Sequence, residues 1–143
     1  MMMRQKSGAR SQESGVGAKT FEGLLGKTFR HGGRGPEEYD CYGLCIEIYR
    51  RLGKHLPPVS TSYELEVNNM AMKVASDFFE QLAGPEPFCL VTFIGRPPYS
   101  THVGVVLPDL YHFIHILEGT QVTIERLDGL LWKRKITGFF KPV

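Results

Sequence analysis

The stretch Asp40-Cys-Tyr-Gly-Leu44 begins a helix and places a thiol in its first turn. Asp40 stands where an N-cap is expected, because its carboxylate can accept hydrogen bonds from the free N–H groups of the first turn. Apolar residues then recur at helical spacing, and Gly53 is a typical C-terminal stop. The pattern predicts a helix over about residues 41–52, with Cys41 at its N-terminus.

Cys41 is a candidate nucleophile because of this position. A thiol at a helix N-terminus lies near the positive end of the aligned peptide dipoles, which favours the nucleophilic thiolate. The glycine-rich loop ahead of it, residues 30–39, allows the backbone to approach a substrate closely. A small buried hydrophobic role is the alternative for Cys41, and it is the simplest interpretation of Cys45 and Cys89.

Short β-rich runs separated by turn residues make up the second half of the chain. They cover residues 88–94, 102–107, 111–117, 122–127 and 136–140. Ahead of them, Thr61-Ser-Tyr-Glu64 fits a capping box and predicts a second helix that continues to about residue 82. Helices followed by short-looped strands indicate an α+β fold with an antiparallel sheet of about five strands.

Two histidines lie on neighbouring expected strands, His102 and His115, 13 residues apart (115 − 102 = 13). Paired strands lie about 5 Å apart, so the two imidazoles can form a general base and the group that orients it. His112 competes for the second role, but the period-two alternation of a strand puts His112 and His115 on opposite faces. Each histidine alone can be an ordinary surface or core residue, whereas the combination with Cys41 points to nucleophilic catalysis.

Length, charge and composition exclude several other functions. With 143 residues one domain is expected, and we assign residues 20–143 to it and residues 1–19 to a flexible polar arm. The net charge of +2 is too small to indicate nucleic-acid binding, and no apolar run approaches the roughly 18 residues of a membrane span. The arm lacks the apolar stretch of a secretory signal, so we expect synthesis in the cytoplasm.

These motifs resemble those of the NlpC/P60 family of cysteine peptidases. The family's usual pattern is DCSGL, then HVGIYLG, then a third polar residue, commonly His, on the next strand. The matching segments are Asp40-Cys-Tyr-Gly-Leu44, His102-Val-Gly-Val-Val-Leu107 and Ile114-His115. The resemblance covers about residues 21–141 and implies a papain-like α+β fold, with the helix of the nucleophile packed on the sheet.

The resemblance implies a cysteine endopeptidase or amidase that cleaves an amide bond in peptidoglycan stem peptides, typically between γ-D-glutamate and diaminopimelate. By position, Cys41 is the nucleophile, His102 the general base and later the acid, and His115 the group that orients His102. Asp40 and Tyr42 match positions that line the substrate site. The family implies neither a metal nor another cofactor.

Residues 38–44 and 132–140 are most similar to the phage-tail and prophage branch of the family. This similarity implies partners at the tip of a phage or phage-like tail, with the N-terminal arm as one candidate contact. It also implies delivery to the periplasm or the cell wall.

Two departures from the family pattern bear on activity. Tyr42 replaces the common Ser, and Phe29 replaces a Tyr that many members carry twelve residues before the nucleophile (41 − 29 = 12). A phenylalanine cannot donate a hydrogen bond, although Tyr39 or Tyr42 can substitute for the missing phenol. The departures favour the alternative of a catalytically silent structural tail-tip or hub component, whereas the cysteine and the two histidines favour an enzyme. A thiol acyltransferase or lipid-acting relative on the same fold is a weaker alternative.

Overall fold

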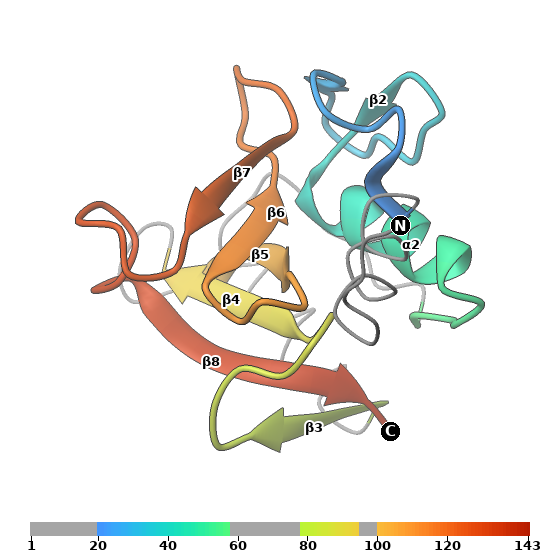
Figure 1. The fold of residues 1–143 in the computed structure, drawn as a ribbon. Coiled ribbons are helices and arrows are strands. Elements are labelled where there is room, and N and C mark those ends of the chain that lie inside the picture. Colours follow the sequence, from blue (N-terminus) through green and yellow to red (C-terminus); the bar gives the residue numbers. More distant parts are fainter. Residues whose placement is uncertain (1–19, 58–77, 95–99) are drawn as a thin grey trace, which may run out of the picture.

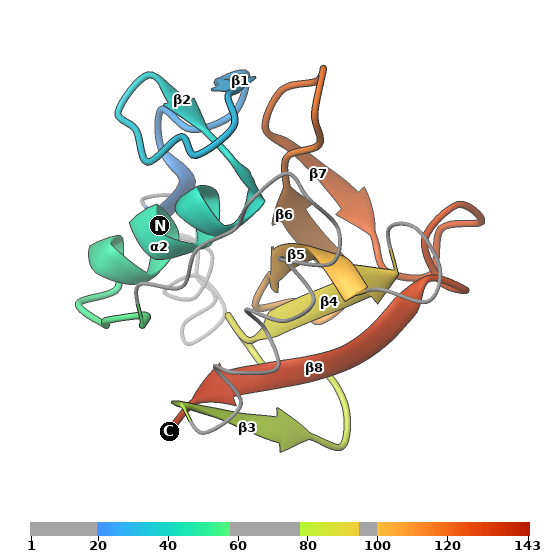
Figure 2. The same ribbon diagram turned by 180° about the vertical axis from the view of Figure 1, so that it is seen from behind.

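The computed structural model of the protein describes residues 20–57, 78–94 and 100–143. In chain order the elements are β1 (Thr28–Phe29), β2 (Glu38–Tyr39), α2 (Cys41–Arg51), β3 (Phe79–Leu82), β4 (Leu90–Ile94), β5 (Ser100–Val106), β6 (His112–His115), β7 (Thr123–Arg126) and β8 (Ile136–Pro142). Figures 1 and 2 show these elements from opposite sides. The expected N-terminal arm lies outside the described residues. Within the described ranges, no helix is long and apolar enough to cross a membrane.

Among the described residues, six strands form one antiparallel sheet in the order β3-β8-β4-β5-β6-β7. Helix α2 packs against β5 and β6, and the short parallel pair of β1 and β2 lies beside it (Figures 1 and 2). The α+β fold with a helix that begins at Cys41 is confirmed, and all five predicted strands pair in this sheet. β8 extends to Pro142, beyond its predicted end, because it pairs with β3 on one side and β4 on the other.

The predicted second helix is wrong at its C-terminal end, where Phe79–Leu82 forms strand β3. Leu82 lies opposite Phe139 of β8, which is 57 residues later in the chain (139 − 82 = 57). Pairing with a distant strand therefore overrides the local helical spacing. The rest of that prediction, residues 61–77, lies outside the described residues.

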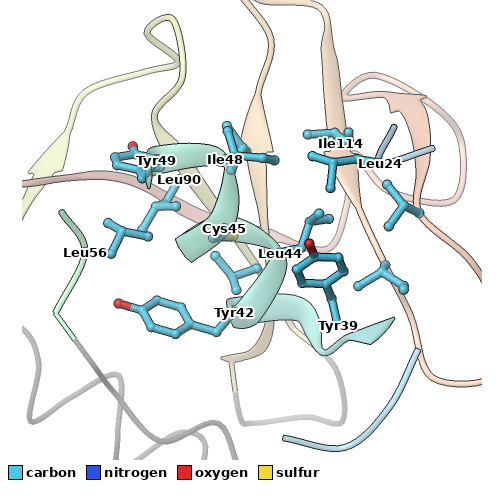
Figure 3. Packing of buried hydrophobic residues seen from close by; sticks show 14 of the residues in the cluster. Leu24, Tyr39, Tyr42, Leu44, Cys45, Ile48, Tyr49, Leu56, Leu90 and Ile114 are labelled. Carbon is cyan, nitrogen blue, oxygen red and sulfur yellow. The ribbon is translucent and has the colours of Figure 1, made fainter. Parts of the chain in front are cut away.

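Apolar side chains form a cluster on each face of the sheet. Val105 and Ile114 lie in the cluster that α2 covers, whereas Val106 and Phe113 lie in the other, because neighbouring residues of a strand point to opposite faces. Buried members of the α2 cluster include Leu24, Tyr39, Tyr42, Leu44, Cys45, Ile48, Tyr49, Leu56 and Leu90 (Figure 3). The second cluster contains Cys89, Val91, Phe93, Leu127 and Trp132 as well. The two cysteines other than Cys41 are therefore core residues, as predicted.

The ends of α2 follow their sequence signals. Asp40 is the N-cap, and its carboxylate accepts a hydrogen bond from the N–H of Gly43. Beyond the other end, Gly53 has a φ of 74°, in the left-handed region that glycine adopts without strain. Arg50 and Arg51 lie in the last turn, where a positive charge complements the helix dipole. These interactions stabilise both ends of the helix that carries the candidate nucleophile.

Candidate active site

Asp40 holds the backbone at the start of α2. It is buried, and its Oδ1 atom accepts hydrogen bonds from the N–H of Gly43 and from Nη1 of Arg34, each at 2.6 Å. Its own N–H donates to the carbonyl oxygen of Gly33 at 3.0 Å, which ties the preceding loop to the helix. The N-cap role predicted for Asp40 is confirmed, and contact of Asp40 with a substrate stays a prediction.

Cys41 is partly buried in the first turn of α2. Burial, followed by the neighbouring Asp40 carboxylate, raises the pKa of the Cys41 thiol to about 11. Hydrogen bonds from the backbone N–H groups of Val103, Tyr42 and Cys41 itself oppose this rise in pKa without cancelling it. The start of the helix thus favours the thiolate, as expected, but desolvation of the thiolate outweighs this effect, and the Cys41 thiol is protonated in the resting protein.

The N–H of Val103 joins the start of α2 to strand β5. Because this group hydrogen-bonds to the Cys41 thiol, the thiol lies against β5, beside the residue that follows His102. Cys41 and His102 are 61 residues apart in the chain (102 − 41 = 61). The packing of α2 on β5 thus brings the predicted nucleophile to the strand that carries the predicted base.

His102 on β5 and His115 at the end of β6 are hydrogen-bonded to each other. Nε2 of His102 lies 2.9 Å from Nδ1 of His115, and Nε2 of His115 lies 2.6 Å from Oε2 of Glu125 on β7. Both histidines are buried, whereas the Glu125 side chain is 37% exposed. His112 hydrogen-bonds to Asp109 in the turn between β5 and β6 instead. Three neighbouring strands therefore carry one chain of hydrogen-bonded groups, which we call the relay: His102, His115 and Glu125.

Gly104 provides the space for the bond between the two imidazoles. It shares a face of β5 with His102, because strand residues two apart point the same way. Val105 pairs with Ile114, which places Gly104 opposite His115. A β-carbon on Gly104 would lie 2.9 Å from the carbonyl oxygen of Ile114 and 3.1 Å from the β-carbon of His115. Any side chain at this position would push β5 and β6 apart where the relay crosses from one to the other.

Aromatic rings enclose the two imidazoles. The Trp132 ring centroid lies 5.7 Å from that of His102 and 4.9 Å from that of His115. Phe93 packs against His102 with a centroid distance of 5.5 Å, and Phe113 packs against His115 at 4.6 Å. These rings exclude water from the imidazoles on the sheet face opposite to α2.

Both imidazoles are neutral at neutral pH. Burial, then the charges of His115 and Lys135, lowers the pKa of His102 to about 3. Burial also lowers the pKa of His115, although its hydrogen bond to Glu125 acts in the opposite direction. Since the Cys41 thiol is protonated as well, the resting site holds a neutral acid and a neutral base instead of an ion pair. Such a pair can transfer a proton from sulfur to nitrogen while the sulfur attacks a carbonyl carbon.

Tyr42 and Phe29, the two departures from the family pattern, make contacts within the protein. Tyr42 is fully buried, and its hydroxyl donates to the carbonyl oxygen of Pro57 at 2.5 Å. Phe29 pairs with Tyr39 between β1 and β2 and packs edge-on against His31, with ring centroids 5.1 Å apart. Contact of Tyr42 with a substrate stays a prediction.

Cys45 lies one helical turn after Cys41 but belongs to the α2 cluster. It is fully buried, and burial raises the pKa of its thiol well above the ordinary value. In the described part of the chain, no group of three or more His, Cys, Asp and Glu residues is arranged to hold a metal ion.

The chain matches a known family over most of its length. Residues 26–141, which include α2 and all of the six-stranded sheet except its last residue, match the profile described as the NlpC/P60 family. This chain belongs to the NlpC/P60 family. Members of the family are typically cysteine peptidases.

Solved NlpC/P60 structures share this fold. A Staphylococcus aureus protein of the NLP/P60 family, described as similar to lipoprotein, is 17% identical with a TM-score of 0.66, covering 100% of this chain and 45% of that chain. NlpC1 from Trichomonas vaginalis is 20% identical with a TM-score of 0.65, covering 99% and 48%. The NlpC/p60 domain of the peptidoglycan hydrolase SagA is 17% identical with a TM-score of 0.60, covering 90% and 97%. This chain thus spans about half the length of the first two proteins. Among curated proteins, none matches the chain.

Two residues of this NlpC/P60 site were absent from the site predicted from sequence. Glu125 shares a strand face with Thr123 by alternation, but the sequence does not reveal the register of β7 against β6. Trp132 lies in the loop between β7 and β8, and its contacts with the histidines are long-range. Its indole N–H has no hydrogen-bond partner among the described residues. The only local signal for the contact of Trp132 with the two histidines was a large apolar ring between two strands.

Proposed function

We propose that this NlpC/P60 domain is a cysteine endopeptidase or amidase that cleaves an amide bond in peptidoglycan stem peptides. One observation carries the proposal: the Cys41 thiol lies at a helix start against β5, the strand that carries His102, and His102 is hydrogen-bonded to His115 on the neighbouring strand β6. A thiol, an imidazole and a group that orients the imidazole are the parts that nucleophilic hydrolysis needs. Membership of the family and the likeness to a domain of a peptidoglycan hydrolase support the same chemistry.

The first step is attack of the Cys41 sulfur on the carbonyl carbon of the scissile amide. Because the thiol is neutral at rest, His102 takes its proton as the sulfur–carbon bond forms. The carbonyl π electrons move to the oxygen, which becomes an oxyanion. The N–H groups at the start of α2, that of Cys41 first, are the donors available to stabilise this charge.

The second step releases the amine and then the acid. The imidazolium of His102 gives its proton to the leaving nitrogen as the carbon–nitrogen bond breaks, which leaves a thioester on Cys41. A water molecule then attacks the thioester, His102 takes a proton from that water, and the proton returns to the departing thiolate. The relay of His115 and Glu125 holds the imidazole of His102 in place throughout.

The test is mass spectrometry of muropeptides incubated under reducing conditions with the wild type, Cys41→Ala and Cys89→Ala. Cys89 is buried in the second cluster, so its variant controls for loss of a thiol elsewhere in the fold. We expect cleavage by the wild type and Cys89→Ala and none by Cys41→Ala. Product masses should identify the bond between γ-D-glutamate and diaminopimelate. Muropeptides left intact by the wild type would contradict the proposal.

A catalytically silent structural role is the second candidate, and the two departures from the family pattern favour it. Phe29 has no hydroxyl to donate, and the hydroxyl of Tyr42 is bonded to Pro57. Tyr39, the other candidate for a substituting phenol, is buried. If the wild type cleaves muropeptides neither as the free protein nor within its assembly, the structural role is supported.

We further propose that the protein acts at the tip of a phage or phage-like tail and reaches the periplasm or the cell wall with it. The similarity of residues 38–44 and 132–140 to the phage-tail branch supports this placement, with residues 1–19 as a candidate contact to tail proteins. Quantitative proteomics of purified particles should find the chain in a fixed ratio to tail proteins. Presence in cell extract together with absence from the particles would contradict the placement.

A further inference from the structure

We propose that Glu125 is a positioning residue whose carboxylate fixes the tautomers of His115 and His102 and leaves Nδ1 of His102 free to take the proton of Cys41. The inference rests on the proposed function and deepens it. Glu125 does not touch the reacting atoms, because it meets the site through His115 alone in the described part of the chain.

The Glu125 carboxylate determines which nitrogen of His115 carries the proton. An ionised carboxylate only accepts hydrogen bonds, so its 2.6 Å contact with His115 requires a proton on Nε2 of that imidazole. A neutral imidazole carries one N–H, and burial keeps His115 neutral by lowering its pKa. Nδ1 of His115 therefore bears a lone pair.

His115 in turn determines which nitrogen of His102 carries the proton. Since Nδ1 of His115 can only accept, the 2.9 Å contact requires that Nε2 of His102 donates. His102 is neutral too, so its Nδ1 is left with a lone pair. This nitrogen is the one outside the relay, and it is the one that can act as the base toward Cys41.

Strand register brings Glu125 to this position. In the pairing of β6 with β7, Thr123 lies opposite His115 and Glu125 lies opposite Phe113. Phe113 and His115 share a strand face, so Glu125 is the diagonal neighbour of His115, within reach of a long side chain. His115 is 1% exposed, so bulk water does not compete with the carboxylate for its Nε2–H.

Without the Glu125 carboxylate, His115 and His102 could each carry the proton on Nδ1 instead of Nε2. With no acceptor at its Nε2, His115 can carry its proton on Nδ1 and donate it to Nε2 of His102. The proton of His102 then has to sit on Nδ1, where it blocks transfer from the Cys41 thiol. Glu125 thus selects between a relay that can accept a proton from the nucleophile and one that cannot.

The experiment is ¹H–¹⁵N correlation spectroscopy of histidine side chains in the wild type, Glu125→Met, Glu125→Gln and Glu118→Gln. The spectra report directly which ring nitrogen carries the proton. Met is unbranched and close in size to Glu but accepts no hydrogen bond, whereas the Gln oxygen still can. Glu118 is the matched control, because its carboxylate bonds to His31 at 2.8 Å on the exposed surface. Glu125→Leu serves as a second acceptor-free variant if Glu125→Met does not fold.

We expect Nε2–H tautomers on both histidines in the wild type, Glu125→Gln and Glu118→Gln, and Nδ1–H forms in Glu125→Met. With muropeptide substrate, kcat of Glu125→Met should fall about tenfold or more with KM nearly unchanged, since only the proton transfer is affected. Glu125→Gln should retain most of the activity. A merely structural role for Glu125 would lower thermal stability without changing the tautomers.

The two proposals fail in distinguishable ways. A wild type that cleaves nothing, with Nδ1–H tautomers appearing in Glu125→Met, would overturn the peptidase and support the positioning role. Cleavage by the wild type, with wild-type tautomers and kcat in folded Glu125→Met, would overturn the positioning role and leave the peptidase standing.

Discussion

A β-carbon on Gly43 would lie 2.0 Å from the carbonyl oxygen of Gly33, so the loop before α2 and the first turn of the helix touch through their backbones. The same carbonyl accepts the N–H of Asp40, the residue before the nucleophile. Gly33 is equally constrained, because its own β-carbon would lie 2.9 Å from three backbone atoms. The position of Cys41 is therefore set by close backbone packing at two glycines, neither of which has room for a side chain.

Gly43→Ala should destabilise the protein and displace the thiol. The added methyl cannot be accommodated without moving the loop, and overpacking of this kind costs roughly 1–3 kcal/mol of unfolding free energy or more. Urea denaturation and muropeptide cleavage measure the two effects. Gly84→Ala is the control, because a β-carbon there meets nothing within 4 Å. Equal stability of the two variants would contradict the packing argument.

Alkylation of Cys41 by iodoacetamide should accelerate with pH up to about 11. The thiolate is the reactive form, and burial and Asp40 raise the thiol pKa to about 11. Below that pH the rate should rise about tenfold per pH unit, as the thiolate fraction does. Peptide mass spectrometry after timed quenching follows Cys41 separately from the buried Cys45 and Cys89. A rate that is already constant around neutral pH would indicate a preformed thiolate.

The free energy of unfolding should fall as the pH drops below 6.5, and His102 should account for part of the fall. The pKa of His102 is about 3 in the folded protein and close to 6.5 when unfolded, so the unfolded chain binds more protons between these values. Between about pH 7.5 and pH 5 this difference amounts to about 2 kcal/mol. Urea denaturation at both values should show a smaller pH effect in His102→Asn than in the wild type. An identical pH effect in both proteins would mean that His102 is not held neutral.

Gly104→Ala should break the contact between the two imidazoles. Its methyl would press on Ile114 and on the β-carbon of His115, which separates β5 from β6 at the relay. We expect a loss of kcat of the order of 100-fold, the lower range of what a general base contributes, in a protein that is still folded at the assay temperature. Circular dichroism measures whether Gly104→Ala is folded, and muropeptide kinetics measure its kcat. Full activity in folded Gly104→Ala would show that the relay tolerates a wider gap.

Local signals in the sequence were sufficient for the half of the site that lies on α2. The cap at Asp40, the helical spacing after it and Gly53 all act within one helix, so they predicted its start and its end closely. His102 and His115 could also be placed together, because they belong to strands joined by one tight turn.

Long-range strand pairing and burial could not be predicted from local signals in the sequence. Phe79–Leu82 is a strand because β8 pairs with it, and Glu125 meets His115 because of a register that no local motif specifies. The rise in the pKa of the Cys41 thiol was not predicted, for a related reason. A helix dipole is visible in a sequence, whereas the desolvation that outweighs it depends on what the rest of the fold packs around the thiol.

β8 lies between β3 and β4 in the sheet, yet it is the last of the described strands along the chain. On the ribosome, β3 and β4 emerge before the strand that joins them, so neither can complete its pairing until Ile136–Pro142 has been made. The thiol, both histidines and Glu125 are therefore all synthesised before the sheet that holds them can close. A nascent chain that stalls before residue 136 carries every group of the site on α2 and on strands β5, β6 and β7, which pair with one another, but it lacks the strand that joins β3 to β4. The part of the sheet that holds the site is therefore complete in sequence before the part that extends it.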